Sequence, residues 1–282
     1  MAECGVCFRH CKIEEGRLGF CGGRTAKNGK TEAFNYGRIT SAALDPIEKK
    51  PLMRFFPGSM IFSVGSFGCN LRCPFCQNSD ISWSERAKKL AETAETASPE
   101  QLVDVAISLR PRGNIGIAFT YNEPLIGYEF VVDTAKLAKE KGLKSVMVTN
   151  GCATLSVLEE LSPYIDAMNI DLKGFTDRYY KEVLGGDRRM VMEFIEHAVR
   201  TCHVELTTLI VPGENDSEEE MRALSGWVSG LNNPDGESVP LHVSRFFPRF
   251  RMTDREATSI RTVYRLADIA KESLKYVYTG NC

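Results

Sequence analysis

A loop with three closely spaced cysteines constrains this sequence more than any other feature. The segment GCNLRCPFCQN places Cys69, Cys73 and Cys76 in a C-x3-C-x2-C pattern. Cysteine thiolates are the usual ligands of iron–sulfur clusters, so three of them can hold three irons of a 4Fe–4S cube and leave the fourth iron open to a substrate. The preceding residues 59–68 are apolar and β-branched, which predicts a strand that leads into the loop.

A second group of cysteines lies near the N-terminus. Cys4, Cys7, Cys11 and Cys21 are spaced C-x2-C-x3-C-x9-C among several glycines. This pattern predicts a small, loop-rich knuckle to which a metal would supply folding energy. Four cysteines suit a closed tetrahedral zinc site, and they also suit an auxiliary iron–sulfur cluster. The glycines around the long C-x9-C spacing favour zinc slightly.

Composition narrows the class of protein. Seven of the ten cysteines fall into these two clusters, which favours metal binding in a reducing cytoplasm over a disulfide framework. The net charge is -2 and charges of both signs are mixed, so nothing favours nucleic acid as a partner. We find no signal peptide and no apolar run of the roughly 20 residues that a membrane helix needs. We therefore expect a cytoplasmic protein with neither a nucleic-acid nor a membrane partner.

Apolar runs alternate with helical patterns from residue 59 onward. We expect strands at 59–65, 114–120, 144–150, 165–172, 203–211, 239–246 and 274–280, and helices at 98–110, 125–141, 177–184, 188–201 and 256–273. Such alternation predicts parallel β/α units. Six repeats are fewer than the eight of a closed barrel. We therefore expect an α/β fold in which residues 59–282 form an open, partial (β/α)6 barrel and residues 1–58 form the knuckle and an extension.

Polar residues follow four of the expected strands. Because the carboxyl ends of parallel strands meet at one mouth, we expect these tips to form a common site. The tips are the cysteine loop and the tripeptides Tyr121-Asn122-Glu123, Thr149-Asn150-Gly151 and Asp171-Leu172-Lys173. Two other features have plainer interpretations. The polar run Asp45, Glu48, Lys49 and Lys50 is interpreted as a solvated turn, and Cys152 as an ordinary buried thiol.

Taken in order, these segments resemble the radical S-adenosylmethionine (SAM) superfamily. The similarity is to the pyruvate formate-lyase activating enzyme-like branch and, within it, to the AmmeMemoRadiSam system radical SAM enzymes. The matching segments span nearly the whole chain: the N-terminal knuckle and residues 45–52, 56–59, 68–78, 119–124, 167–175, 209–216 and 276–281. The cysteine pattern alone is moderately specific, whereas the ordered set is highly specific.

The resemblance implies a cofactor site. Cys69, Cys73 and Cys76 would hold a 4Fe–4S cluster whose open iron binds the amino and carboxylate groups of SAM. The residues implied to contact SAM are Phe75, Cys76, Gln77, Asn122, Glu123, Asn150, Asp171 and Lys173. The implied reaction is reductive cleavage of SAM to a 5′-deoxyadenosyl radical that abstracts hydrogen from a substrate. A reductant such as flavodoxin or ferredoxin would supply the electron.

Two departures from the family pattern leave alternatives open. Tyr121 and Asn122 stand where the family has two glycines, and Phe247 stands where relatives often carry a histidine. These departures motivate a second hypothesis, a non-catalytic iron–sulfur protein that serves electron transfer or binding. Within the enzyme hypothesis, the substrate is either a partner enzyme that receives a glycyl radical or a protein or small molecule handled with Memo-like and AMMECR1-like proteins.

Overall fold

An eight-stranded sheet forms the centre of the molecule. The computed structural model describes residues 1–282, apart from the side chains at positions 88, 91 and 92. The strand order is β14-β13-β12-β11-β10-β9-β7-β6. The parallel strands are β7 (Met60–Gly65), β9 (Asn114–Phe119), β10 (Lys144–Thr149), β11 (Ala167–Asp171), β12 (His203–Ile210), β13 (Leu241–Arg245) and β14 (Val277–Gly280), and β6 (Ser41–Pro46) runs antiparallel to β7.

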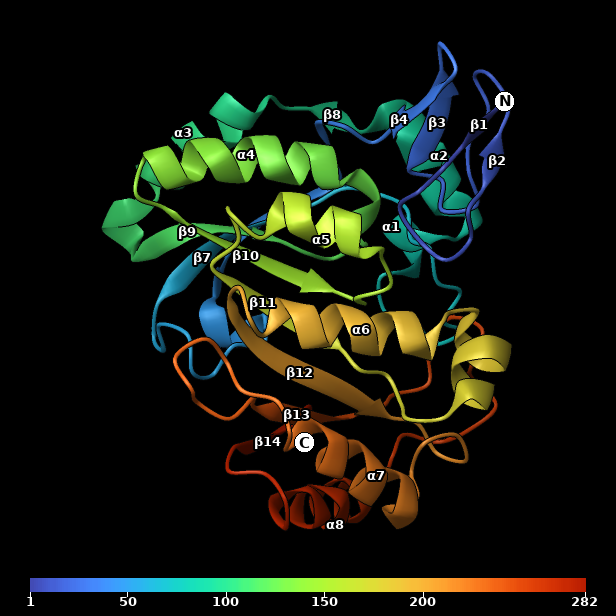
Figure 1. Ribbon diagram of the computed structural model, residues 1–282, viewed down its shortest axis with the longest axis vertical. Helices are drawn as coiled ribbons and strands as arrows, with labels where there is room; N and C mark the ends of the chain where they lie inside the picture. The colour runs from blue at the N-terminus through green and yellow to red at the C-terminus, as the bar shows by residue number, and fades with distance from the viewer.

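Helices connect the successive parallel strands and cover the outer face of the sheet (Figure 1). They are α3 (Pro99–Ser108), α4 (Tyr128–Glu140), α5 (Leu155–Leu161), a π-helix (Tyr179–Leu184), α6 (Arg188–Ala198), α7 (Glu218–Val228) and α8 (Ile260–Lys271). Consecutive parallel strands are neighbours in the sheet, as in a succession of β/α units. The predicted α/β fold, a partial (β/α)6 barrel, is therefore confirmed, and β14 adds a further parallel strand at the edge.

The two faces of the sheet differ in how completely they are covered. On β12, Val204, Leu206 and Ile210 are fully buried in the core cluster that includes helix residues such as Leu266. The alternate residues of β12 point to the inner face, because successive side chains of a strand lie on opposite sides. Among these, Thr207 is only half-buried. The inner face therefore retains space that the outer face does not.

Residues 47–55 cover the amino-terminal half of the inner face. This segment begins with a 3-10 turn (Ile47–Lys49). It packs into a second core cluster made of Ile47, Leu52, Phe55, Ile61, Ala118, Val146 and Ala167. The fully buried carboxylate of Glu205 accepts hydrogen bonds from the backbone N–H groups of Met53, at 3.0 Å, and Arg54, at 2.7 Å. The carboxyl-terminal half of the inner face is left for a site.

The division at residue 58 stays a prediction. Strand β6, from the expected N-terminal extension, pairs along its whole length with β7 of the main sheet. The shorter pairs near the N-terminus are antiparallel: β1 (Ala2–Glu3) with β2 (Lys12–Ile13), β3 (Arg24–Lys27) with β4 (Lys30–Ala33), and β5 (Arg38–Ile39) with β8 (Glu95–Thr96).

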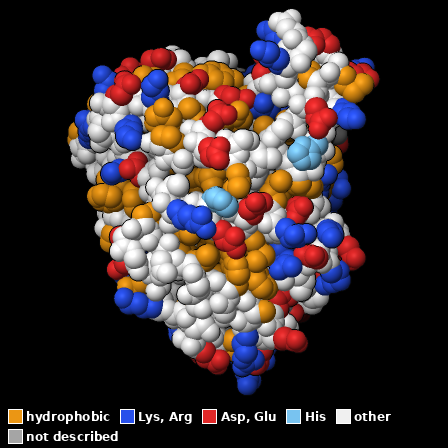
Figure 2. All heavy atoms as spheres, in the orientation of Figure 1, with side chains coloured by type: hydrophobic (Ala, Val, Ile, Leu, Met, Phe, Trp, Pro, Cys, Tyr) orange, Lys and Arg blue, Asp and Glu red, His pale blue; other side chains and the backbone are white. Residues whose placement is uncertain are grey.

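The N-terminal knuckle lies at the end of the sheet where the chemistry is expected. In Figure 1 the arrowheads of β10 and β12 point toward the side that carries the blue N-terminal segment. Two helices, α1 (Ser79–Ser82) and α2 (Glu85–Thr93), follow the cysteine loop there. Figure 2 shows acidic and basic side chains interspersed over this view of the surface. Within the described part of the chain, no helix has both the length and the apolar character needed to cross a bilayer.

Candidate functional site

The backbone conformation of the three-cysteine loop is fixed by a glycine and by hydrogen bonds, one of which joins the loop to the knuckle. Gly68 begins the loop with a φ of +94°, and a Cβ there would lie 2.7 Å from the carbonyl oxygen of Cys21. That carbonyl accepts a hydrogen bond of 3.1 Å from the backbone N–H of Cys69. A turn with a 3.2 Å hydrogen bond from the N–H of Cys76 to the carbonyl of Cys73 closes the loop. Glycine is required where backbone approaches backbone in this left-handed conformation.

The three thiols fit a cationic cluster. Burial raises the pKa of Cys69 well above its usual value and raises that of Cys73 to about 12, and repulsion from the neighbouring thiolates adds to both shifts. Burial also raises the pKa of Cys76. Only the thiolate binds metal, so this environment calls for a strongly cationic centre to offset the charge. Across the described residues, no three His, Cys, Asp or Glu side chains converge on one point as a single metal ion would need. A cluster with irons at separate corners does not require that convergence.

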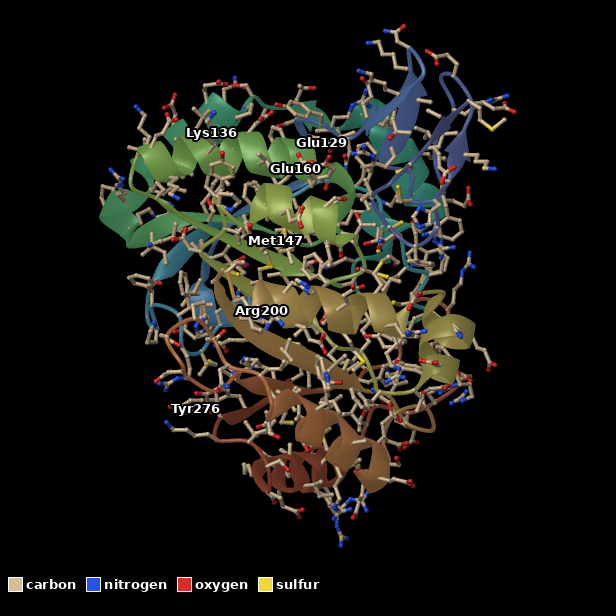
Figure 3. The ribbon with its side chains drawn as sticks, viewed as in Figure 1. Glu129, Lys136, Met147, Glu160, Arg200 and Tyr276 are labelled. Atoms are coloured by element: carbon tan, nitrogen blue, oxygen red, sulfur yellow. The ribbon has the colours of Figure 1, made fainter. Side chains whose placement is uncertain are left out.

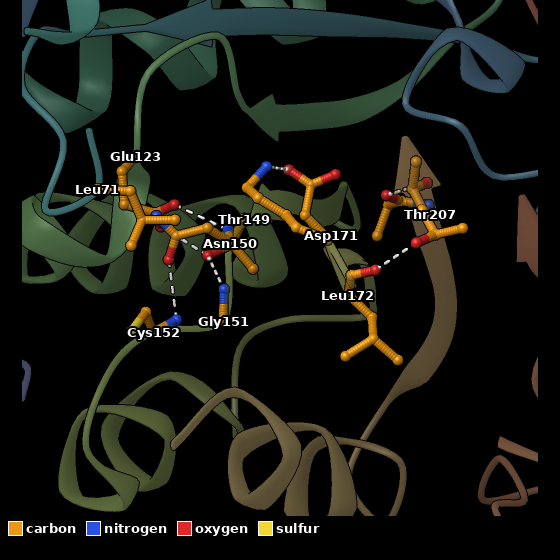
Figure 4. A network of polar contacts seen from close by, with 12 residues as sticks. Leu71, Glu123, Thr149, Asn150, Gly151, Cys152, Asp171, Leu172 and Thr207 are labelled. Atoms are coloured by element: carbon orange, nitrogen blue, oxygen red, sulfur yellow. Dashed lines mark hydrogen bonds and ion pairs between the residues drawn. The ribbon is translucent and has the colours of Figure 1, made fainter. Parts of the chain in front are cut away.

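Glu123 joins the tips of β9 and β10. Its carboxylate is 3% exposed and accepts hydrogen bonds from Thr149 Oγ1 at 2.6 Å, from the backbone N–H of Asn150 at 2.8 Å and from that of Leu125 at 3.0 Å (Figure 4). Burial raises the pKa of Glu123 to about 7 despite these donors, and the Asp171 carboxylate adds to the shift. A cationic ligand group placed nearby would therefore favour ionisation of Glu123.

Asn150 ties the tip of β10 to the cysteine loop. Its amide nitrogen donates to Asn70 Oδ1 at 2.9 Å and lies 3.7 Å from Cys69 Sγ. Its amide oxygen accepts from the backbone N–H of Cys152 at 2.8 Å, and Asn70 Nδ2 donates to the carbonyl of Cys152 at 2.7 Å. The Cys152 thiol is fully buried, as the sequence predicts. The side chain of Asn150 thus contacts the cysteine loop at Asn70 and at the thiol of Cys69.

Asp171 and Lys173 form an ion pair at the tip of β11. Lys173 Nζ lies 2.8 Å from Asp171 Oδ2, with 17% of the lysine and 32% of the aspartate side chain exposed (Figure 4). Burial lowers the pKa of Lys173, but the Asp171 carboxylate and the nearby Cys73 thiolate outweigh it, so the pKa lies well above the usual value. The backbone N–H of Lys173 donates to Tyr180 Oη at 3.0 Å. A fixed ammonium beside the cysteine loop can pair with a carboxylate of a ligand.

The other predicted contacts occupy different places. Phe75 is buried, with its ring edge-to-face against Phe246 at 6.0 Å, whereas Gln77 is exposed. The amide of Asn122 bonds to the backbone, accepting from Ser66 N–H at 2.8 Å and donating to Phe67 at 3.2 Å. The role of each toward SAM stays a prediction, since its test needs the cofactor.

Phe247 follows the strand β13 but is 40% exposed. The residue that reaches Phe75 from this segment is its neighbour, Phe246. The departure at position 247 therefore lies on the surface of the loop that follows β13.

The interpretation of the 45–50 run as a solvated turn is wrong for two of its residues. The Lys50 ammonium is 3% exposed and lies 2.8 Å from Asp45 Oδ2, to which Tyr121 Oη also donates at 2.8 Å. Burial raises the pKa of Asp45, but Lys50 and Tyr121 lower it to about 2. Lys49 matches the expectation, at 67% exposed, and the half-buried Glu48 accepts an exposed hydrogen bond of 2.6 Å from the backbone N–H of Gly58, as in a surface turn. We call Asp45, Lys50 and Tyr121 the inner-face triad.

The sequence carries only a weak signal for this triad. Charged residues bracketed by Pro46 and Pro51 indicate a turn, and nothing local reveals that β6 pairs with β7 and carries Asp45 inward. Beyond the triad, the inner-face residues Val148, Asp171, Thr207, Leu209 and Ser244 are half-buried although they lie on strands inside the sheet. These partly accessible residues lie toward the carboxyl ends of their strands, beyond the part of the inner face that the segment 47–55 covers.

The knuckle surrounds a cavity of its own. Cys4, Cys7 and Cys21 are buried and Cys11 is half-buried. The cavity is lined by Cys4, Val6, Cys7, Arg9, Cys11, Ile13, Gly19, Cys21, Arg24 and Ile126. Burial raises the pKa of Cys7, and that of Cys21 to about 12. The structure therefore brings all four predicted ligands to one cavity, whose thiolates also need a cation.

Comparisons with known proteins agree with this geometry. The sequence model of the Radical SAM superfamily matches residues 63–224. An uncharacterized protein of Methanocaldococcus jannaschii is 41% identical over 282 residues, which cover 99% of this chain and 81% of the relative. The pyruvate formate-lyase-activating enzyme of Clostridium pasteurianum is 30% identical over 181 residues, which cover 62% of this chain and 72% of that enzyme.

Solved structures show the same fold at low sequence identity. Streptococcus suis SuiB bound to S-adenosylmethionine aligns with a TM-score of 0.58 and 13% identity, covering 76% of this chain and 48% of that one. A domain of a pyruvate-formate lyase-activating enzyme from Bacteroides vulgatus aligns with a TM-score of 0.50 and 15% identity, covering 59% of this chain and 99% of that domain.

Proposed function

This chain belongs to the radical SAM superfamily, in the branch of the pyruvate formate-lyase activating enzymes, and on that premise we propose how its site works. It is an enzyme. When bound, the 4Fe–4S cluster and SAM supply a 5′-deoxyadenosyl radical that abstracts hydrogen from a substrate. The non-catalytic hypothesis gains no support, because the polar strand tips of the catalytic family are assembled around the cysteine loop.

The proposed roles follow from the geometry of the tips. Cys69, Cys73 and Cys76 hold the cluster. Lys173 pairs with the SAM carboxylate while Asp171 orients Lys173 and accepts from the ribose, because their ion pair is partly exposed beside Cys73. Glu123 receives the methionine amino group through its carboxylate.

We propose that the remaining residues implied at the cofactor contact the adenine or hold the loops that bind it. Phe75, Cys76 and Gln77 provide backbone and ring contacts to the adenine, and Asn122 shapes the loop by its bonds to residues 66 and 67. Asn150 places Cys69 through Asn70.

The substrate binds at the carboxyl-terminal half of the inner face. The observation that carries this proposal is the half-buried state of Val148 and Thr207, which lie on strands inside the sheet near the strand tips. The buried Glu205 contacts and the inner-face triad fill the neighbouring part of the inner face, which limits the access of water to the radical from that side.

For the finer assignment we propose membership of the AmmeMemoRadiSam system. The segment 45–52, which carries two residues of the inner-face triad, belongs to the motif set that resembles this group. Its substrate is then a protein or small molecule handled with Memo-like and AMMECR1-like partners, and the electron comes from a flavodoxin or ferredoxin. The alternative is a partner enzyme that receives a glycyl radical, which the 30% identical activating enzyme favours. A reducing cytoplasm suits ten free thiols.

We also propose that Cys4, Cys7, Cys11 and Cys21 bind a metal centre, either zinc or a second iron–sulfur cluster. The shared cavity and the burial of three of the four thiols support this proposal. Removal of the metal is expected to unfold the knuckle and to loosen the Cys21–Cys69 contact.

The test of the proposed function is SAM cleavage. The protein is reconstituted with iron and sulfide without oxygen and mixed with dithionite and SAM, and 5′-deoxyadenosine is measured by chromatography. We expect product from the wild type and from Cys202→Ala, whose thiol is buried beside the amino end of β12. We expect none from Cys73→Ala. A fully loaded wild-type protein that forms no 5′-deoxyadenosine would refute the proposal.

A further inference from the structure

The cavity of the knuckle contains a buried hydrogen-bond donor without a partner. Arg24 is 3% exposed, and its Nη1 atom lies 2.6 Å from both carboxylate oxygens of Glu129, on the first turn of α4 (Figure 3). Its Nη2 atom reaches the carbonyl of Thr31 at 3.5 Å. Its Nε atom is buried and has no acceptor within the described residues. Buried donors are almost always satisfied, so an acceptor is expected in the cavity that Arg24 lines.

The chemistry of the cavity points to sulfur as that acceptor. Arg24 lies close enough to Cys4 for the thiolate charge to act on the guanidinium. A second guanidinium, that of Arg9, lines the same cavity and stacks on Phe20 with its carbon 3.4 Å from the ring centre. The two arginines place positive charge beside four cysteines whose thiolates would be anionic, and Arg24 Nε adds an N–H group that has no other acceptor within the described residues. Hydrogen bonds to sulfur are a principal means by which proteins tune the potential of iron–sulfur clusters.

The arrangement favours a cluster over a single zinc ion. The four thiols line a common cavity, yet in the described part of the chain no set of them converges as one tetrahedral ion would require. The same is true of Cys69, Cys73 and Cys76, whose cluster the family fixes. Metal-bound cysteine thiolates accept N–H donors in both kinds of site, but an iron–sulfur cluster adds inorganic sulfides and so offers Arg24 Nε more sulfur acceptors than a zinc ion with four cysteine ligands.

The knuckle is in direct contact with the catalytic loop. The carbonyl of Cys21 accepts the N–H of Cys69 at 3.1 Å, so one hydrogen bond links a ligand of one centre to a ligand of the other. Arg9 Nε donates to the carbonyl of Asn70 at 2.9 Å, and Arg72 donates to the carbonyls of Cys69, at 2.7 Å, and Phe20. Two metal centres whose ligands are hydrogen-bonded to each other would interact electrostatically and exchange electrons.

We propose that Cys4, Cys7, Cys11 and Cys21 bind a second, redox-active iron–sulfur cluster that accepts a hydrogen bond from Arg24 and passes electrons to the catalytic cluster. This inference rests on the proposed function, in which the catalytic cluster is reduced before SAM is cleaved. One electron enters the second cluster from an external one-electron donor of the ferredoxin class. It then moves to the catalytic cluster, so the second cluster is oxidised by one electron and the catalytic cluster is reduced by one.

The first experiment uses the wild-type protein, reconstituted without oxygen and freed of loose iron. We expect about eight irons and eight sulfides per chain, as two cubane clusters require. After reduction, electron paramagnetic resonance is expected to show two cluster signals, of which SAM alters only the one from the cluster with an open iron. About one zinc with about four irons per chain, or a single cluster signal, overturns the inference.

A cysteine variant assigns the second signal. Cys11→Ser changes the half-buried member of the set and is compared with Cys202→Ser, which changes a buried thiol outside it. We expect Cys11→Ser to lose the signal that SAM leaves unaltered, to retain the SAM-responsive signal, and to be reduced more slowly at the catalytic cluster by a reduced ferredoxin. Retention of both signals in Cys11→Ser contradicts the assignment. Failure of wild-type SAM cleavage with dithionite bears on the proposed function alone, whereas the iron count and the number of signals bear on this inference alone.

A pair of variants tests the hydrogen bond from Arg24. Arg24→Lys retains a positive charge next to Glu129 but removes the Nε donor, and Glu129→Gln removes the ion pair but leaves the donor in place. We expect Arg24→Lys to shift the midpoint potential of the second cluster to more negative values, and Glu129→Gln to shift it less. Equal shifts in the two variants, or none in Arg24→Lys, overturn the role assigned to Arg24.

Discussion

The carboxylate of Glu123 accepts a 2.8 Å hydrogen bond from the backbone N–H of Asn150, which joins the turn after β9 to the turn after β10. The same carboxylate accepts a hydrogen bond from Thr149 Oγ1 at 2.6 Å, and the side chain of Asn150 donates to Asn70 in the cysteine loop. Three strand tips are thereby connected through one buried acid. Its protonation state therefore affects how the whole site is held.

Glu123 predicts an unusual pH dependence of stability. Burial raises its pKa from 4.5 to about 7, so the folded protein binds more protons than the unfolded chain between these values. The free energy of unfolding then falls as the pH rises from about 5 to 7, by about 2–3 kcal/mol for a shift of this size. Urea unfolding of the SAM-free protein at several pH values measures this slope. Glu123→Gln should lose that part of the slope, and an unchanged slope would show that another group carries it.

Lys173 predicts a specific loss of SAM binding. Lys173→Met removes the ammonium proposed to pair with the SAM carboxylate, and a charged hydrogen bond contributes about 1.5–3 kcal/mol, so affinity should fall about 10- to 100-fold. Lys181→Met, an exposed change on the neighbouring π-helix, is the matched control and should bind SAM normally. Equilibrium binding to the iron-loaded proteins measures both. An equal loss in the two variants, or a loss of iron in Lys173→Met, would contradict this role.

The inner-face triad predicts that two adjacent lysines differ in their contribution to stability. Lys50→Met removes the main counter-charge of Asp45 on the inner face of β6, and we expect the free energy of unfolding to fall by about 3 kcal/mol. Lys49→Met removes a 67% exposed partner of the same carboxylate, and exposed pairs contribute about 0–1 kcal/mol. Denaturant unfolding of the two variants decides the point. Similar losses would mean that Lys50 is no more buried than Lys49.

Gly68 predicts a backbone requirement at the start of the cysteine loop. Gly68→Ala would place a methyl group 2.7 Å from the Cys21 carbonyl at a φ of +94°, so both strain and a clash are expected. Gly58→Ala has a φ of +82° with open space around it, and it isolates the conformational cost of about 1–2 kcal/mol. We expect Gly68→Ala to lose more stability than Gly58→Ala and to bind less iron on reconstitution. Equal effects on unfolding and iron content would argue against the close contact with Cys21.

Much of the site was predictable because its residues are adjacent in sequence or stand directly after strong strand patterns. The C-x3-C-x2-C loop indicates its chemistry without a fold, and the apolar runs before Glu123, Asn150 and Asp171 indicate that their tips share one edge. The contacts that each of these side chains makes were harder to predict from the sequence. Asn122 bonds to the backbone of the loop, and Phe246 rather than Phe247 meets Phe75.

The inner-face triad shows why the burial of some polar residues could not be predicted from the sequence. Asp45 and Lys50 have the local composition of a solvated turn, and their burial depends on the pairing of β6 with β7 and on Tyr121, 76 positions away. The orphaned Arg24 Nε has the same character, since it is defined by Glu129 and by the cavity around the knuckle cysteines. Long-range contacts of this kind leave no periodic signal in the sequence.

By itself, the sequence determined the three-cysteine loop, the order of strands and helices, and the strand tips that meet at one mouth, because spacing and periodicity are local properties of the chain. The tertiary structure alone decided which polar groups are buried, which are paired and which lack a partner. It placed Cys21 against Cys69 and Lys50 against Asp45, since only folding brings distant segments close enough for backbone and charge to interact.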